Sequence, residues 1–143
     1  TDHRGWVWMV NYMQDSPVTI YDYRHARVTG VSELARYTVR ALSEDRDGNV
    51  WCATDDGLGR VKVSDGKAEK PRFSIVNFGN PQGVLCNERA AMTADDGKLM
   101  FGTTTGLMMI DPKAFATRRC RWRLLPCAST TSPYRPVTPS TGA

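Results

Sequence analysis

The stretch DRDGNVWCATDDGLGRV, residues 45–61, decides the fold. It joins an acidic glycine turn, an apolar segment around Trp51, a second glycine turn and another apolar segment. The Asp-Gly and Gly-Asn steps supply the positive φ that tight hairpins need. The flanking residues are rich in valine, threonine and tryptophan, which favour strands. The stretch therefore predicts short antiparallel strands joined by tight turns.

Three segments of the chain begin alike, at residues 2–8, 45–51 and 95–101, and their glycines lie 43 and 49 residues apart. The second and third copies share four identities at one offset of 49 residues. A period of about 40 to 50 residues with several short strands per unit is typical of β-propeller blades. The repeated structural positions are Gly5, Trp8, Asp45, Gly48, Trp51, Thr54, Gly57, Gly97, Phe101, Thr103 and Gly106.

One complete unit is expected to hold four strands, at residues 39–44, 50–54, 59–63 and 72–78. Residues 50–53 are apolar on both faces, which suits a blade packed between two neighbouring blades. We therefore predict an all-β fold, a partial β-propeller of about two and a half four-stranded blades with a divergent, irregular C-terminal tail. The predicted units are a partial blade at 1–37, a complete blade at 38–79, a final partial blade at 80–116 and a tail at 117–143. The sequence looks like the closing end of a propeller whose earlier blades are missing.

The charge distribution argues against a nucleic-acid partner. The formal net charge is +4, but residues 117–143 contain five arginines and no acidic residue, so the rest of the chain is close to neutral. A face that follows a phosphate backbone needs basic residues spread over a folded surface. No apolar run approaches the roughly 18 residues of a membrane helix, and no signal peptide is recognisable.

Metal, cofactor and catalytic chemistry find little support. Cys52 and Cys86 lie in apolar segments and are expected to be small buried side chains rather than a disulfide. The segment DRDGN has its glycine at the fourth position, where a calcium loop needs it at the sixth. The segment GLGRVKV leads into a strand, which a phosphate loop does not. Adjacent acids on a turn, such as Asp55 and Asp56, point apart, so we expect no metal, no cofactor and no catalytic residues.

The tryptophans divide into two kinds. Trp8 and Trp51 occupy the same repeat position, with Met100 as its third version, and a repeated large apolar position is expected in the core between blades. Trp6 lies inside a turn and has no counterpart in the other copies. We therefore expect Trp6 to be the exposed aromatic residue.

A family resemblance rests on two segments. Residues 39–61, VRALSEDRDGNVWCATDDGLGRV, resemble the two-component regulator propeller repeat. Residues 77–115, NFGNPQGVLCNERAAMTADDGKLMFGTTTGLMMIDPKAF, resemble the last blade of that propeller in hybrid two-component sensors. The resemblance covers residues 2–116 and implies the periplasmic part of an inner-membrane histidine kinase that binds oligosaccharides. It further implies a homodimeric parent, with the remaining propeller blades and a sandwich domain as partners of this segment.

Two other functions remain open, namely a generic propeller module for protein interaction and a fragment of a propeller polysaccharide hydrolase or lyase. The kinase itself is absent from this sequence. After residue 117 the chain departs from the family, with four prolines and no strand-like alternation. This tail is expected to be either a disordered Pro/Ser/Thr segment or a frame-shifted or chimeric end. In the latter case another reading frame near codon 117 should encode a strand pattern.

Overall fold

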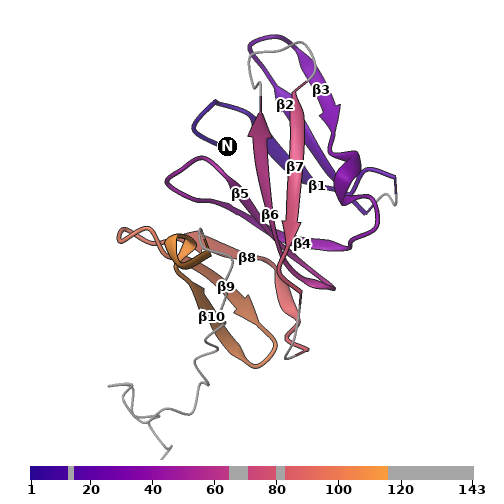
Figure 1. Cartoon of the computed structure of the whole chain (residues 1–143). Helices are drawn as coiled ribbons and strands as arrows, with labels where there is room; N and C mark the ends of the chain where they lie inside the picture. The colour runs from indigo at the N-terminus through magenta and orange to yellow at the C-terminus, as the bar shows by residue number, and fades with distance from the viewer. Residues whose placement is uncertain (13–14, 65–70, 80–82, 116–143) are drawn as a thin grey trace, which may run out of the picture.

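The computed structural model describes residues 1–12, 15–64, 71–79 and 83–115, and they form three antiparallel sheets (Figure 1). The first sheet holds β1 (Val7–Val10), β2 (Val18–Asp22) and β3 (Arg27–Gly30). The second holds β4 (Val39–Glu44), β5 (Val50–Thr54), β6 (Gly57–Ser64) and β7 (Arg72–Asn77). The third holds β8 (Cys86–Thr93), β9 (Leu99–Thr103) and β10 (Gly106–Ile110). Two 3-10 turns complete the described part, η1 (Ser32–Leu34) and η2 (Pro112–Phe115).

Each sheet is a meander whose strands pair in chain order. The three sheets fan out from one another like the blades of an open propeller, so the prediction of an all-β partial propeller is confirmed (Figure 1). In the second sheet β4 and β5 have the predicted bounds, β6 is longer and β7 ends one residue early. The tail at 117–143 lies outside the described residues.

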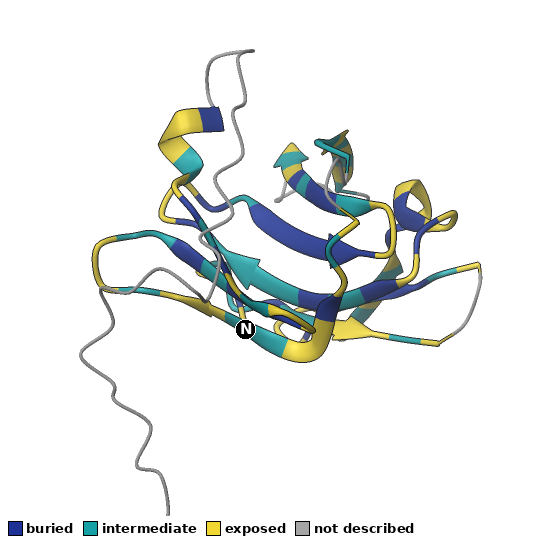
Figure 2. Cartoon of the chain, turned by 90° about the horizontal axis from the view of Figure 1, so that it is seen from below, coloured by how far each residue is buried: buried dark blue, intermediate teal, exposed yellow. Residues whose placement is uncertain are grey.

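Hydrophobic side chains between the sheets form two cores. The first core joins the first and second sheets and takes Val50, Cys52 and Val61 from one face of the second sheet. The second core joins the second and third sheets and takes Trp51 and Ala53 from the opposite face. Strand β5 is buried along its whole length because its two faces serve two different cores (Figure 2). We call the face of a blade toward the next blade in the chain its forward face, and the opposite one its rear face.

The glycine turns form as predicted by their chemistry. Gly57 pairs with Thr54 across a two-residue hairpin, and Gly106 pairs with Thr103 in the same way. Gly57 has a φ of 111°, which side chains other than glycine rarely adopt. These hairpins set the register in which the second and third strands of each blade pair.

Cys52 and Cys86, the cysteines among the described residues, are buried and free, as predicted. Cys52 is enclosed in the first core, and burial raises the pKa of its thiol to about 12. Burial also raises the pKa of Cys86, which lies in the second core. Both thiols therefore stay protonated and act as packing groups.

Candidate functional site

Asp45 is the centre of the turn between β4 and β5. One of its oxygens accepts hydrogen bonds from the backbone amides of Asp47 and Asn49, and the other accepts from the indole of Trp51 at 2.7 Å. The carboxylate is buried, and it needs these donors because an unpaired buried charge is very costly. Asp45 therefore has a structural role in this turn.

The first blade repeats this arrangement. Asp2 accepts from the backbone amides of Arg4 and Trp6 and from the indole of Trp8 at 3.0 Å. In the third blade the equivalent turn begins at Ala94. The amide of Ala94 donates to the carbonyl of Lys98, as the amide of Asp45 donates to the carbonyl of Asn49. The third copy therefore aligns with the second at Ala94 rather than at Asp95, and it contains neither the aspartate nor the tryptophan of this pair.

The expectation that Trp6 is exposed is wrong. Its side chain is only 6% exposed and belongs to the first core. The backbone amide of Trp6 donates to Asp2, and the turn directs the Trp6 ring inward. The guanidinium of Arg4 lies 5.8 Å from the centre of this ring. Trp8 and Trp51 are between blades as predicted, with Trp51 fully buried and Trp8 half-buried against the first core.

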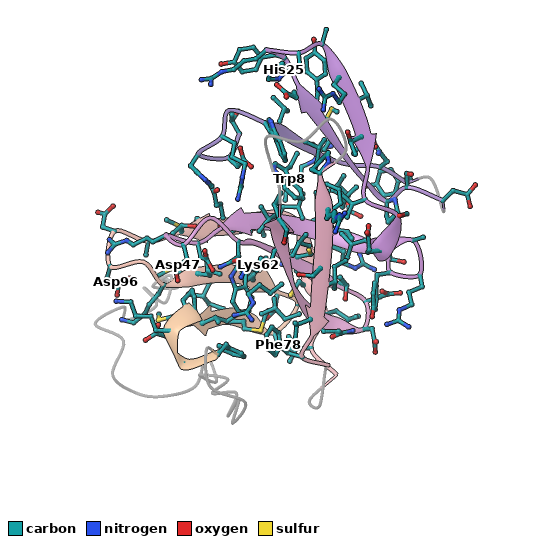
Figure 3. All side chains as sticks on the ribbon, turned by 45° about the horizontal axis from the view of Figure 1, so that its top comes forward. Trp8, His25, Asp47, Lys62, Phe78 and Asp96 are labelled. Atoms are coloured by element: carbon teal, nitrogen blue, oxygen red, sulfur yellow. The ribbon has the colours of Figure 1, made fainter. Side chains whose placement is uncertain are left out.

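The glycine turns of successive blades, which contain Gly5, Gly48 and Gly97, contact one another at one end of the sheets. The ring of His3 lies over Gly48, where a Cβ would come within 2.5 Å of it, and the side chain of Arg46 lies over Gly97 in the same manner. Figure 3 places Asp47 and Asp96, from the second and third turns, on the same side of the molecule. The glycines of these turns are thus required by contact with the preceding blade as well as by their positive φ.

A polar pocket of about 170 Å³ lies between the second and third turns and the start of η2. Its charges are partly neutralised internally, since Lys98 Nζ lies 2.6 Å from Asp96 Oδ2. The hydrogen bond from Lys98 lowers the pKa of Asp96. No group of residues in the described part of the chain is arranged to hold a metal ion.

A different set of side chains lies at the other end of the sheets, where strands β4 and β8 each contain one irregularity. The register of β4 against β5 shifts between Val39 and Ala41, and that of β8 against β9 shifts between Cys86 and Ala91. Such bulges re-aim side chains and are frequent beside functional sites. Arg40 is the residue at the first shift, and its Nε has no hydrogen-bond partner among the described residues.

The second shift presents Glu88 and Arg89, and Arg89 has a positive φ of 58°. Glu88 accepts a hydrogen bond from the hydroxyl of Tyr12 at 2.9 Å, and its other oxygen lies 3.9 Å from the guanidinium of Arg40. The hydrogen bond to Glu88 raises the pKa of Tyr12. Residues of all three blades therefore meet here, although they lie up to 76 positions apart in the chain.

Beside Tyr12 lies a pocket of about 300 Å³ between the first and second blades. The ring of Tyr12 is 80% exposed. Within the pocket the guanidinium of Arg36 stacks over Tyr37 and donates to its hydroxyl at 2.7 Å. The lining residues are Asn11, Tyr12, Pro17, Ala35, Arg36, Tyr37, Thr38 and Val39. An open aromatic ring beside amide, guanidinium and hydroxyl groups can hold a flat ligand that carries polar groups at its rim.

None of these pocket residues belongs to the repeat positions found from the sequence. The repeat positions lie in turns and strands, where they shape the blades: Thr54 Oγ1 donates to the carbonyl of Gly57, and Phe101 packs in the second core. Tyr12 and Arg36 lie in connections whose residues differ from those of the equivalent connections in the other copies. A search for repeated residues therefore passes over them.

The blades and their turns define the class of the fold: the chain is a segment of a β-propeller. Residues 33–56 match the family model of the two component regulator propeller, so the chain carries this repeat. No helix among the described residues is long and apolar enough to cross a membrane.

A solved structure supports the same assignment. The chain is similar to the crystal structure of the extracellular domain of a B. thetaiotaomicron protein described as a one component system, with 25% identity and a TM-score of 0.55. The similarity covers 86% of this chain but 15% of that domain, so the chain spans a small part of its relative's length. A comparison with curated proteins gave no match.

Proposed function

We propose that this chain is part of the extracytoplasmic ligand-sensing propeller of a hybrid two-component regulator, and that it performs no chemistry of its own. The match to the regulator propeller repeat and the similarity to an extracellular domain support this proposal. In the intact sensor the remaining blades and a sandwich domain would adjoin this segment in the periplasm. The sensor would be a homodimer anchored in the inner membrane and would pass its signal to a histidine kinase.

The proposed ligand is an oligosaccharide, bound at the Tyr12 pocket. The observation that carries this proposal is the exposed ring of Tyr12 beside a polar pocket of about 300 Å³. Sugar rings stack their C–H faces on aromatic rings while polar side chains bond the hydroxyls. Here the guanidinium of Arg36 would donate to a sugar hydroxyl and the side-chain oxygen of Asn11 would accept from one, since Nδ2 of Asn11 already donates to Ser16 and Thr19. The volume is at the lower end of the range for ligand pockets and suits one or two sugar units.

Calorimetric titration of the chain with a panel of neutral and acidic oligosaccharides tests the proposal. We expect one class of oligosaccharide to bind, and Tyr12→Ala to weaken that binding about tenfold, corresponding to roughly 1.4 kcal/mol. Tyr23→Ala is the matched control, because Tyr23 is an exposed tyrosine in the turn between β2 and β3, outside the pocket. Equal binding by the two variants would contradict the site, and binding of no sugar would contradict the ligand.

The gene around this chain tests the regulator context separately. The sensor assignment requires a membrane helix and a histidine kinase encoded downstream in the same frame. The alternative of a general interaction module requires neither. A polysaccharide hydrolase or lyase would require acids or histidines directed into the central funnel by other blades.

A further inference from the structure

Three arginines gather around Tyr12, from the connection before β4, from β4 and from β8. Arg36 lines the same pocket as Tyr12, and the side chains of Arg36 and Arg89 are exposed. The guanidinium of Arg40 lies 3.9 Å from the carboxylate of Glu88, to which Tyr12 donates. The hydrogen bond to Glu88 raises the pKa of Tyr12, and the positive charges of Arg40 and Arg89 oppose this rise. All three guanidinium groups therefore act at one exposed aromatic ring.

Two of these arginines keep N–H donors free for a ligand. The guanidinium of Arg36 lies 4.9 Å from the centre of the Tyr37 ring and donates to its hydroxyl at 2.7 Å, which holds the group in place. A guanidinium has further N–H donors beyond the one used here. Arg89 has no ion-pair partner among the described residues. The pocket thus has one arginine that is fixed in position and a second that is unpaired.

The acids at this end of the sheets are already bonded. Glu88 accepts from Tyr12 and lies beside Arg40. Asp55 accepts from the backbone amide of Thr38 at 2.9 Å. No acidic side chain is among the described residues that line the pocket. Three guanidinium groups against two bonded carboxylates leave a positive charge here, and a positively charged cleft attracts anions.

The backbone at Arg89 is an independent sign of a ligand site. Its φ of 58° lies in the left-handed region, which a residue with a long side chain seldom adopts. Strain of this kind persists where the surrounding structure imposes it, and it clusters at sites that hold ligands. Arg89 lies within the register shift of β8, and the neighbouring Glu88 bonds Tyr12 of the first blade. The site therefore lies among the three blades, rather than on the rear face of the first or the forward face of the third.

We propose that the ligand of this pocket is an anionic oligosaccharide, whose carboxylate or sulfate group is bound by Arg36 and Arg89 while a sugar ring stacks on Tyr12. The planar guanidinium matches both acid groups, because its parallel N–H donors meet two oxygens at once. This inference rests on the proposed function and adds to it the charge class of the ligand. A neutral sugar would leave the arginines of the pocket without a counter-charge.

Calorimetric titration of the chain with matched pairs of disaccharides tests the charge class. The pairs are disaccharides of galacturonic, glucuronic and mannuronic acid, each with its methyl ester, and lactose with and without a sulfate ester. We expect an acid or the sulfate ester to bind about tenfold or more tightly than its uncharged partner. The advantage should shrink as sodium chloride rises from about 50 mM to about 500 mM, because salt screens exposed charges.

Arg36→Gln and Arg89→Gln test the residues. Each should weaken binding of the preferred anionic disaccharide about tenfold and leave its uncharged partner nearly unaffected. Arg72→Gln is the matched control, because it removes an exposed arginine from β7, outside the pocket, and it should bind like the unsubstituted chain. Circular dichroism checks that each variant keeps its strands, and Arg36→Lys, which keeps the charge but loses the paired donors, should be intermediate.

The outcomes separate this inference from the proposed function. Uncharged disaccharides that bind as tightly as their anionic partners, with the loss in Tyr12→Ala, would overturn the anionic ligand and keep the sugar site. An anionic preference that neither Arg36→Gln nor Arg89→Gln reduces would overturn the assigned residues. Binding of no disaccharide at all would overturn the proposed ligand and this inference with it.

Discussion

The indole of Trp51 donates a hydrogen bond to Asp45 across 2.7 Å, which ties strand β5 to the turn that precedes it. The first blade has the same bond between Trp8 and Asp2. In the third blade alanine and methionine stand at the two equivalent positions. The two residues are therefore present or absent together, as expected of partners whose separate loss would leave a buried polar group unsatisfied.

Removing the indole donor should destabilise the second blade. Trp51→Phe keeps an aromatic ring but leaves one oxygen of Asp45 short of a donor, and we expect a loss of about 1 to 3 kcal/mol. Urea unfolding of Trp51→Phe, Asp45→Asn and the double variant measures the coupling, which should be at least about 0.5 kcal/mol. Additive losses would show that the bond contributes nothing of its own.

Gly48 is required by two separate effects. Gly48→Ala combines a φ of 78° with a Cβ that meets the His3 ring at 2.5 Å. Gly79→Ala is the matched control, because Gly79 has a φ of 71° and open space around its Cβ. The control should cost about 1 to 2 kcal/mol through backbone strain alone, and Gly48→Ala should cost clearly more.

The double variant His3→Ala with Gly48→Ala separates the two effects. Without the imidazole only the backbone strain is left, so the additional loss caused by Gly48→Ala in the His3→Ala background should approach that of Gly79→Ala. Thermal unfolding of the variants measures this comparison. An unchanged cost in the His3→Ala background would show that the contact between the two turns is not the cause.

Cys52 should make stability fall in alkaline solution. Its pKa is raised by burial from 9.0 to about 12, so the folded state holds the proton more tightly than the unfolded state. Stability is therefore unaffected below pH 9 and decreases as the pH rises toward 12, by up to about 1.4 kcal/mol per pH unit. Cys52→Ala should lack this component, and urea unfolding at pH 8 and pH 11 compares the two chains. Equal pH dependence would contradict a protonated, buried thiol.

Tyr12 should titrate above an ordinary tyrosine. Its hydroxyl donates to Glu88, which raises its pKa above 10.0 because ionisation would break the bond and bring two negative charges together. In Glu88→Gln the pKa should return toward its ordinary value. Titration of tyrosine signals by NMR measures both chains. An unchanged Tyr12 pKa in Glu88→Gln would show that the first and third blades do not meet at this point.

The sequence predicted the blades well because their strands and turns depend on local chemistry. Glycines at a regular spacing, together with the apolar residues between them, were sufficient to place β4 and β5. The double-sided burial of β5 followed from apolar residues at successive positions, which have no polar face to offer to water. The burial of Cys52 and Trp51 followed from the same pattern.

Trp6 shows where local reasoning failed. Its position inside a turn predicted exposure, but Asp2 holds the turn in a shape that directs the ring into the first core. The spacing between Asp2 and Trp8, which equals that between Asp45 and Trp51, was the available signal for this arrangement. It needed the hydrogen bonds of the structure to be interpreted.

By itself the sequence determined the fold class, the repeat and the residues that build each blade, because these depend on contacts between residues that are near in the chain. Only the tertiary structure decided that Tyr12, Arg40 and Glu88 meet at one end of the sheets. They come from three different blades, and strand irregularities at two of them set their direction.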